Sequence, residues 1–385
     1  MNNMRKYKLK AKLLSPLIVQ KNRQSNVSGG LNYLPGSTFR GAVAGQFLRI
    51  AGEPGDDKFR RLFIDDPVMF PDLLPSDGVS GVSVPLPMTA YSCKRKPGFL
   101  SGEKKHGVVD ELAAMCGAKI KGISQKEQFT CRKCKEDLKP FNGFWNNNVS
   151  KPRLFTPSQS YSYHTGIDRT TGTLAESVFF MVEGIDPEYL DNDGKLDSQF
   201  LTGDVWLNDA QFEILNSLLS DPVFAGSDKT RGHGELEVEI APVEHESFDV
   251  EKWNDAFREK VNRETGVKLP EEVFFSIDLI SAAILVDRFL RPTYELNLDL
   301  EGVHCESRFL KGTTVRGWQS AWGLPKNEDR ALMPGSVFLY RYTGSDRETL
   351  YRYLENVSIN GVGLRRAEGF GRVNICNLLH TQEVL

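Results

Sequence analysis

The sequence has no apolar run long enough to cross a bilayer, which takes about 20 residues. The longest candidate, SAAILV at 281–286, suits a buried strand. The basic opening MNNMRKYKLKAKLL has no apolar signal core, so we expect neither export nor a membrane partner. The expected compartment is the cytoplasm.

An excess of positive charge is also missing. The formal net charge of the 385 residues is −3, so no global field draws nucleic acid or an anionic membrane to the molecule. Any polyanion would have to be bound by local clusters of cations. The length is more than one hydrophobic core usually serves, which predicts two domains.

Cysteine is scarce, with six residues in the chain, and we read these as thiols or metal ligands before disulfides. Four of them, Cys93, Cys116, Cys131 and Cys134, form the pattern C-x22-C-x14-C-x2-C. Tetrahedral zinc takes four thiolate or imidazole ligands, and a CxxC turn supplies two of them. We predict that these four residues bind zinc. The ion would be structural, because four protein ligands leave no position open for water.

Other readings of the cysteines stay open. The helix-like segment DELAAMCGA could bury the thiol of Cys116, in which case His106 would be the fourth zinc ligand. The thiols could also be unrelated buried groups, or the CxxC pair could be a redox pair. Cys305 and Cys376 lie in strand-like contexts and are expected to be ordinary core thiols.

An internal repeat organises the chain. The phrase YLPGSTFRGA at 33–42 has a near copy, FLKGTTVRGW, at 309–318. Before each copy lies a segment of alternating apolar and polar residues, the signature of a half-buried strand. After each copy come an amphipathic helix pattern, a glycine-rich turn and a last strand. The matching segments are 7–20 and 273–288, 207–219 and 345–356, and 227–240 and 364–376.

Both phrases predict the start of a helix, over STFRGAVAGQFLRI and TTVRGWQSAWGL, with Ser37 and Thr313 as N-cap residues. The resulting order of strand, helix, strands, helix, glycine-rich turn and strand is that of a ferredoxin-like unit. We therefore predict an α+β protein of two tandem ferredoxin-like (RRM-like) domains with Gly-rich loops.

The domain boundaries follow from the repeat. The first domain is predicted over 1–243, with an insertion at about 52–172 that contains the zinc-binding segment 93–134. The second is predicted over 273–385. Between them, 244–272 is expected to form a connecting helix with one apolar face. An insertion of this length should fold locally, since long structureless loops are uncommon.

Several motifs together resemble the RAMP superfamily of CRISPR effector subunits. They are the first phrase, the segment HTGIDRTTGTLAESVFF at 164–180 and the basic glycine-rich turn before the last strand. More narrowly, FRRLFIDDPVMFPDLLP, VPLPMTAYSCKR and CRKCKEDLKPFNGFW resemble the two-domain RAMP subunit of type III-D effector complexes. The resemblance is strongest over residues 7–240.

This resemblance implies a noncatalytic subunit that binds guide RNA (crRNA) in an antiviral ribonucleoprotein. Such a subunit would hold the five-prime tag of the guide and dock backbone RAMP subunits and the large palm-domain subunit, with target RNA as a possible further partner. The rival expectation is a RAMP endoribonuclease, either a target-cleaving backbone subunit or a guide-maturation enzyme. Asp110 and Asp168 are the candidate catalytic residues for target cleavage. The first predicted helix has no His, which disfavours guide maturation.

The two phrases and the two turns supply most of the predicted RNA contacts. Glycine lets a backbone approach closely, helix N-terminal amides and hydroxyls bind phosphate, and arginine adds charge. An aromatic ring such as that of Phe370 can stack on a base. The same residues could instead be turn glycines, caps and solvated charges. The predicted RNA-binding residues here are Gly36, Ser37, Thr38, Arg40, Arg231, His233, Lys311, Gly312, Thr313, Arg316, Arg365, Arg366 and Phe370.

Two further RNA contacts come from the resemblance alone. In RAMP proteins the segment matching 164–180 leads into a hairpin that lies along the guide, so His164 and Arg169 are expected to touch RNA.

A basic cluster near the CxxC pair could contact phosphates or a neighbouring subunit, or could be ordinary solvated surface. It comprises Lys94, Arg95, Lys96, Lys104 and Lys105.

Overall fold

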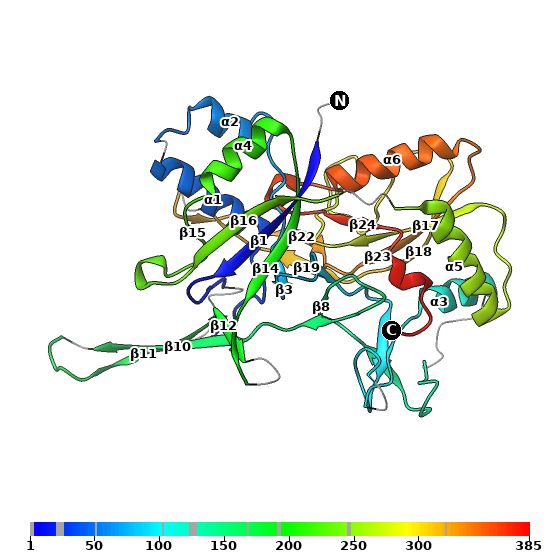
Figure 1. Ribbon diagram of the computed structural model, residues 1–385, viewed down its shortest axis with the longest axis horizontal. Coiled ribbons are helices and arrows are strands. Elements are labelled where there is room, and N and C mark those ends of the chain that lie inside the picture. The colour runs from blue at the N-terminus through cyan, green and yellow to red at the C-terminus, as the bar shows by residue number, and fades with distance from the viewer. Residues whose placement is uncertain are drawn as a thin grey trace. The chain divides into compact units, whose positions relative to one another are not determined.

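The chain has a mixed α/β fold of several small, mainly antiparallel sheets (Figure 1). The computed structural model describes residues 4–20, 27–50, 52–101, 104–122, 129–167, 169–190, 194–244, 248–319 and 322–385. Two compact units result. The first comprises Met1–Ser83, Leu154–His245 and Ala367–Gly369, and the second comprises Val84–Arg153, Glu246–Arg366 and Phe370–Leu385. Most of the expected insertion, including the CxxC pair, therefore belongs to the second unit.

The first unit contains a five-stranded sheet with three helices. The strand order is β15-β16-β1-β14-β3, and every neighbouring pair is antiparallel. The strands are β1 (Arg5–Leu13), β3 (Leu74–Ser76), β14 (Phe200–Leu207), β15 (Val223–Phe224) and β16 (Glu235–Pro242). The helices are α1 (Gly36–Ile50), α2 (Asp57–Phe63) and α4 (Asp209–Leu218). Leu9, Ala11 and Leu13 of β1 are buried on one face, as their alternation predicts.

The helices of this unit begin where side chains can cap them. The Asp72 carboxylate accepts a 2.7 Å hydrogen bond from the Gly36 N–H at the start of α1. Asn208 and Gln211 form a capping box at the start of α4. Phe39, Val43 and Phe47 recur every fourth residue and enter the same core as β1. The predicted helices after the first phrase and over 207–219 are both confirmed, but α1 begins at Gly36, so Ser37 lies inside its first turn and is not the N-cap.

A long hairpin extends from the first unit (Figure 1). It is formed by β10 (Gln159–Ile167) and β11 (Leu174–Ile185), which pair from Gln159↔Ile185 to Ile167↔Leu174. Its base is joined by β2 (Val27–Ser28) in parallel. The remaining short elements are β9 (Leu154–Phe155), β12 (Glu188–Leu190), β13 (Leu196–Ser198) and the 3-10 turn η1 (Lys229–Arg231).

The second unit is built around a four-stranded antiparallel sheet with the order β18-β23-β17-β24. Its strands are β17 (Val273–Leu279), β18 (Val303–Phe309), β23 (Val337–Tyr342) and β24 (Val373–Ile375). Helices α5 (Val250–Thr265) and α6 (Arg347–Asn360) pack on it. Trp253, Phe257 and Val261 of α5 are buried in this core, so the amphipathic helix predicted within 244–272 is confirmed.

Shorter elements complete the second unit. Those before α5 are β4 (Val84–Pro85), β5 (Ala90–Cys93), β6 (Val108–Asp110), α3 (Leu112–Ile120), β7 (Leu138–Pro140) and β8 (Phe144–Trp145). Those after β18 are β19 (Gly312–Val315), β20 (Trp318–Gln319), β21 (Leu324–Pro325), β22 (Asp329–Leu332) and the 3-10 turns η2 (Arg366–Glu368) and η3 (Leu378–Thr381), of which η2 crosses the unit boundary. Within this group, β5, β6 and β7 form a small sheet with β5 in the centre.

The second phrase does not begin a helix. Residues Gly312–Val315 form β19, which pairs with β22, so the predicted helix over TTVRGWQSAWGL is wrong, and Thr313 is not an N-cap. The physical reason is the β-branched run Thr313, Thr314 and Val315, which is crowded in a helix and suits an extended strand. The first copy has Ser37, Thr38 and Phe39 at these positions and forms α1.

The two glycine-rich turns, in contrast, have the same backbone. Each has a 3-10 turn between a left-handed residue and a pair of glycines with positive φ. The φ values are 56° for Asp228, 83° for Gly232 and 80° for Gly234, and 56° for Arg365, 93° for Gly369 and 71° for Gly371. Only glycine fits the last position, since a Cβ on Gly234 would lie 1.9 Å from the Ala225 carbonyl oxygen, and one on Gly371 1.7 Å from that of Val362.

The serines after the first strand of each repeat also correspond. Ser15 Oγ accepts a hydrogen bond of 2.9 Å from the Glu235 N–H, and Ser281 Oγ accepts one of 2.9 Å from the Arg372 N–H. The serine thus ties the first strand of each repeat to the strand that follows the turn. The two repeats therefore share the structure of their turns and of the strands around them. They differ at the phrases 33–42 and 309–318, where the first begins a helix and the second forms a strand.

Candidate metal centre and nucleic-acid interface

Three cysteines and one histidine come together in the second unit. The donor atoms of Cys93, His106, Cys131 and Cys134 all lie within 4.8 Å of one another. The Sγ atoms of Cys93 and Cys134 are 3.4 Å apart, and Cys131 Sγ is 3.4 Å from His106 Nδ1. A disulfide has a bond of about 2.05 Å, so the two sulfurs are not bonded to each other.

The small sheet and a tight turn position these ligands. Cys93 ends β5, the central strand, and the N–H of His106 donates to the Lys96 carbonyl at 3.1 Å. Cys131 and Cys134 lie on a turn closed by the Lys135 N–H, which donates to the Cys131 carbonyl at 2.9 Å. Lys135 takes a left-handed φ of 62° there. We call residues 93–110 and 129–140 the knuckle lobe.

The donor set fits zinc. Tetrahedral bonds of about 2.3 Å to sulfur and about 2.0 Å to nitrogen separate neighbouring ligand atoms by about 3.5–3.8 Å. Burial opposes ionisation of Cys93, but the backbone N–H groups of Lys96 and Arg95 hold the pKa of its thiol below the usual value. Burial and the cations Lys96 and Lys133 lower the pKa of His106, which keeps the imidazole neutral. Thiolate and neutral imidazole are the forms that bind a metal.

Cys116 is not part of this group, contrary to the four-cysteine prediction. It lies on α3, where its side chain is 3 % exposed and belongs to the core formed with α5. Burial raises the pKa of its thiol to about 12, so it stays protonated. The structure thus favours the alternative in which His106 is the fourth ligand. Cys376 is a buried core thiol as expected, whereas Cys305 is exposed.

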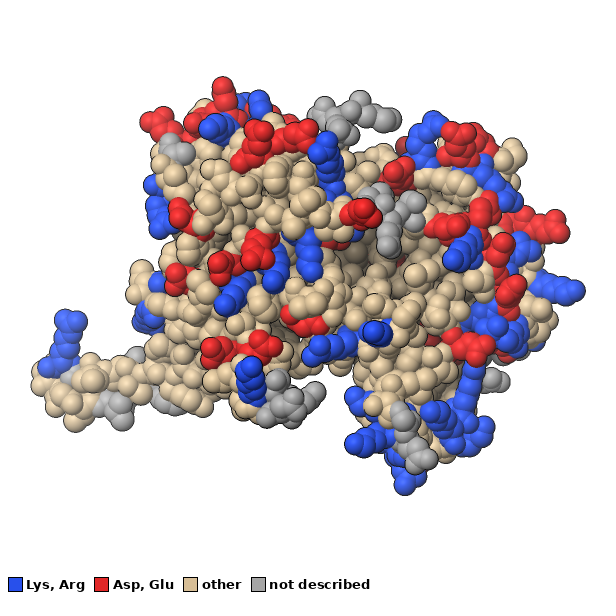
Figure 2. Space-filling model, in the orientation of Figure 1, with Lys and Arg blue, Asp and Glu red and all other residues tan. Residues whose placement is uncertain are grey.

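The predicted basic cluster lies on the knuckle lobe. Lys94, Arg95, Lys104 and Lys105 are exposed, and Lys96 is half-buried. Lys and Arg side chains gather on this lobe, which is drawn in cyan and blue-green in Figure 1 and lies at the lower right of Figure 2. The cluster is therefore a surface feature beside the metal ligands.

The first phrase, residues 33–42, is packed against other parts of the protein, and its first helical amide is already hydrogen-bonded. The Gly36 N–H already donates to the Asp72 carboxylate. A Cβ on Gly36 would lie 2.9 Å from Gly369 Cα, so the start of α1 and the second glycine-rich turn meet at two glycines. Arg40 donates to the Phe63 carbonyl at 2.9 Å and lies over its ring. Ser37 and Thr38 are half-buried beside them.

The residues of the two turns differ in their exposure. Arg366 is exposed and donates to the Asn360 carbonyl at 3.2 Å. Arg365 is ion-paired with Asp329 at 2.6 Å and covers the ring of Phe370. The second turn thus presents one exposed arginine beside one that is already paired. In the first turn, the exposed Arg231 lies near Asp228, and His233 is half-buried.

The second phrase presents its residues on a strand and the turn that follows it. Arg316 is ion-paired with Glu328 at 2.6 Å, and the exposed Lys311 precedes β19. A Cβ on Gly312 would lie 2.8 Å from the hydroxyl of Tyr294. Trp318 is 55 % exposed. The helix N-terminus on which a phosphate site was predicted for this copy does not exist.

The hairpin residues occupy two places. His164 is half-buried within β10, and Arg169 is exposed near the tip of the hairpin. Asp168, the second candidate catalytic residue, lies outside the described residues. Tyr161 and Tyr163 are 49 % and 65 % exposed along β10, so the hairpin presents aromatic rings to solvent.

Asp110, the other candidate catalytic residue, is in the interior of the second unit. Its carboxylate lies 3.0 Å from His380 Nδ1, and Thr89 donates to it at 2.5 Å. His380 Nε2 lies 3.0 Å from the carboxylate of Asp278, and the Lys260 ammonium donates to the Asp110 and His380 carbonyls. These groups are between 0 % and 4 % exposed. The Asp110 carboxylate therefore does not reach an RNA on the surface.

The charges in this network support one another. Burial alone would lower the pKa of His380, but Asp110 and Asp278 raise it to about 10. The protonated His380 in turn holds the pKa of Asp110 below its usual value, against the effect of burial. Sequence reasoning missed this network, because its five members are spread along the chain from Thr89 to His380 and no local pattern marks them.

The family follows from the sequence match. The sequence model of the RAMP superfamily matches residues 10–237, more than half of the chain. The chain belongs to the RAMP superfamily. No curated protein matches it.

Solved structures of type III-B complexes resemble this RAMP chain at low identity. A chain of the Cmr-beta complex bound to cognate target RNA is 12 % identical, with coverage of 92 % of this chain and 95 % of that one and a TM-score of 0.43. A chain of the same complex bound to cognate target RNA and AMPPnP is also 12 % identical. The match covers 90 % of this chain and 93 % of that one, with a TM-score of 0.38. The family assignment rests on the sequence match alone.

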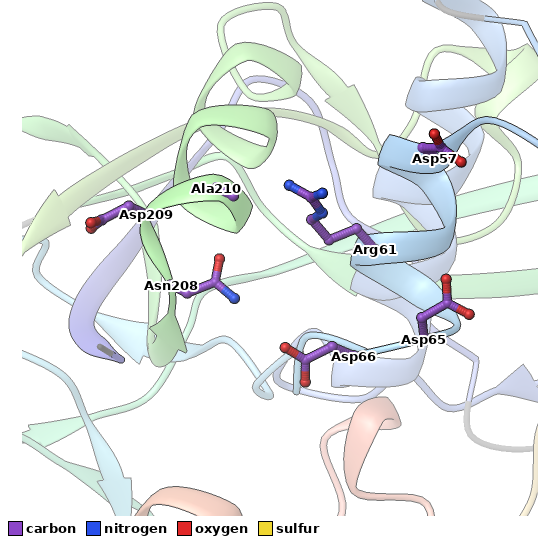
Figure 3. Close-up of a pocket in the computed structure, with 7 residues that line it drawn as sticks. All are labelled: Asp57, Arg61, Asp65, Asp66, Asn208, Asp209 and Ala210. Atoms are coloured by element: carbon purple, nitrogen blue, oxygen red, sulfur yellow. The ribbon is translucent and has the colours of Figure 1, made fainter. Parts of the chain in front are cut away.

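The RAMP chain also has an acidic cavity of about 580 Å³ in its first unit (Figure 3). Arg61 of α2 points across it toward the start of α4, among aspartates. The lining residues are Asp57, Arg61, Asp65, Asp66, Asn208, Asp209 and Ala210. Its excess of negative charge repels phosphate.

No helix in the described parts of the chain has the length and apolar character needed to cross a membrane.

Proposed function

We propose that the chain is a noncatalytic, guide-RNA-binding subunit of a type III CRISPR effector in antiviral defence. It would hold the five-prime tag of the guide and dock backbone RAMP subunits and the large palm-domain subunit, with target RNA along the hairpin. RAMP membership and the resemblance of the motifs to the type III-D subunit support this proposal. We place it in the cytoplasm.

Two ferredoxin-like domains in tandem are part of the proposal. In each unit the first strand of the repeat lies between the last strand and the third, with the order β16-β1-β14-β3 in one and β24-β17-β23-β18 in the other. Both repeats have a helix before the last strand and the same glycine-rich turn. The second unit has β19 to β22 in place of the helix that follows the first strand of a ferredoxin-like unit.

The observation that carries the proposal is the meeting of the first phrase with the second glycine-rich turn. Gly36 and Gly369 are both buried, and their lack of side chains lets the start of α1 and the turn pack directly against each other. Beside this contact, Ser37 and Thr38 supply hydroxyls, and we assign charge on the second unit separately to the exposed Arg366. Because Asp72 occupies the Gly36 N–H, we assign phosphate binding to these hydroxyls and cations rather than to the helix amides.

Further contacts are proposed on each unit by itself. Arg316 is held by Glu328 in an exposed ion pair, which is worth little in water and can be exchanged for a phosphate. Arg40 is assigned a positioning role through Phe63. We propose that Arg169, His164 and the tyrosines of β10 follow the RNA along the hairpin, where aromatic rings can stack on bases.

Crosslinking of the guide within the purified complex tests the proposal. Crosslinks from this chain that are confined to the tag are the expected result. Regular crosslinks along the spacer would make it a backbone subunit instead. Replacement of Asp168 by alanine should leave target-RNA cleavage by the assembled complex unchanged, and loss of cleavage with intact assembly would establish the endoribonuclease.

A further inference from the structure

The charge of the chain is distributed unevenly. Residues 93–140 contain 12 Lys and Arg against 6 Asp and Glu, although the whole chain carries a formal net charge of −3. The basic residues are concentrated in and around the knuckle lobe, whose cations gather in Figure 2. The exposed ones on the lobe are Lys94, Arg95, Lys104, Lys105, Arg132, Lys133, Lys135 and Lys139.

The metal ligands and these cations alternate along the chain. Lys94 follows Cys93, and Lys105 precedes His106. Arg132 and Lys133 lie between the two cysteines of the CxxC pair, and Lys135 follows them. Because the four donor atoms lie within 4.8 Å of one another, the segments that carry the cations are held on one small body. A bound metal would therefore fix the spacing of the positive charges.

The positive charge exceeds what the metal centre needs. Zn²⁺ with three thiolates and a neutral imidazole has a net charge of −1, which one neighbouring cation balances. Among the described residues, Arg132 alone of these eight is ion-paired with a carboxylate, that of Glu264 at 3.1 Å. The other seven of these exposed cations are available to an anionic partner.

We propose that the knuckle lobe is a second RNA-binding surface, which grips the phosphate backbone of a single strand without reading its bases. The proposal rests on the proposed function and adds a contact region on the second unit. A protein partner fits this surface less well, since interfaces between proteins have an apolar core. In the described part of 93–140, only Leu100 and Ile120 are exposed large apolar side chains.

Binding of a labelled single-stranded RNA to the full chain, measured by fluorescence anisotropy across a salt series, tests the proposal. The lobe variants are Lys94→Ala with Arg95→Ala, and Lys104→Ala with Lys105→Ala. The matched control is Lys252→Ala with Lys268→Ala, which removes two exposed cations of the same unit. Each lobe variant should weaken binding several-fold and reduce the salt slope by about 1.4, at about 0.7 for each phosphate contact on a single strand.

The replaced side chains are exposed, so each variant should fold. A metal content and a melting temperature equal to those of the wild type identify the folded variants. Unchanged affinity and slope in both lobe variants would overturn the lobe proposal, while binding by the wild type would keep the proposed function. If the wild-type chain does not bind RNA, both proposals fail. Retained RNA affinity with loss of another subunit from the complex would make the lobe a protein-docking surface and overturn its role in RNA binding.

Discussion

At the residue scale, the question at the metal centre is which residue is the fourth ligand beside Cys93, Cys131 and Cys134. Cys116 and His106 both lie between Cys93 and the CxxC pair, and spacing alone does not separate them. The difference is packing. Cys116 faces the α5 core from one helix, whereas His106 is attached through its N–H to Lys96 on the loop after β5.

Metal analysis of cysteine variants provides the corresponding prediction. Cys131→Ser with Cys134→Ser should lose one zinc per chain, and His106→Ala should lose it as well. The control Cys116→Ala should keep its zinc, because that thiol lies in the core. Zinc lost from Cys116→Ala but retained in His106→Ala would restore the four-cysteine site.

The buried network makes a second prediction at this scale. His380 has a pKa near 10 in the folded chain, above its ordinary value of 6.5, so folding favours the protonated imidazole. This contribution to stability is fully present below about pH 6.5 and is lost as the pH rises through about 10. Denaturant unfolding of the wild type should therefore give a falling free energy of unfolding over that range.

Replacement of one partner isolates the effect of the network. His380→Ala leaves Asp110 and Asp278 buried without their cation, which should cost about 3–5 kcal/mol near neutral pH. The variant should also lose this part of the fall in stability with pH, whereas Lys252→Ala should behave like the wild type. If His380→Ala and Lys252→Ala showed the same fall in stability with pH, that fall would come from groups other than His380.

At the element scale, the reliability of sequence reasoning followed the strength of the local signal. The helix of Val250–Thr265 was predictable, because Trp253, Phe257 and Val261 recur at helical spacing. The alternation of Leu9, Ala11 and Leu13 revealed β1 in the same way. The second phrase forms a strand despite its likeness to the first, because its run of β-branched residues is the stronger local determinant.

The glycine-rich turns give the prediction at this scale. Gly234→Ala and Gly371→Ala combine a left-handed backbone with a clash against a carbonyl oxygen, so each should lower the free energy of unfolding by about 2 kcal/mol or more. Gly41→Ala in α1 is the control. It has no atom within 4 Å of its added Cβ and should be neutral or stabilising by about 1 kcal/mol. Equal effects in urea unfolding would contradict this account.

At the scale of the whole molecule, the two compact units take up the chain in alternating stretches, and no local signal in the sequence marks where one gives way to the other. The segment Val84–Arg153 packs with the second unit through contacts that link residues far apart in sequence. Lys260, for example, is fully buried and bonds to the Asp110 carbonyl 150 residues away. No period or composition in the sequence indicates such a contact.

The two arginines assigned different roles in the RNA surface give the last prediction. Arg366 is exposed, so Arg366→Ala should leave stability unchanged and reduce the salt slope of guide binding by about 0.7, the value for one phosphate contact on a single strand. Arg40 is held by Phe63, so Arg40→Ala should lower the free energy of unfolding by about 1 kcal/mol and leave the slope nearly unaltered. Salt titrations and urea unfolding of both variants measure the two effects. The reverse result, with the slope lost at Arg40 and stability lost at Arg366, would exchange their roles and place the phosphate at α1.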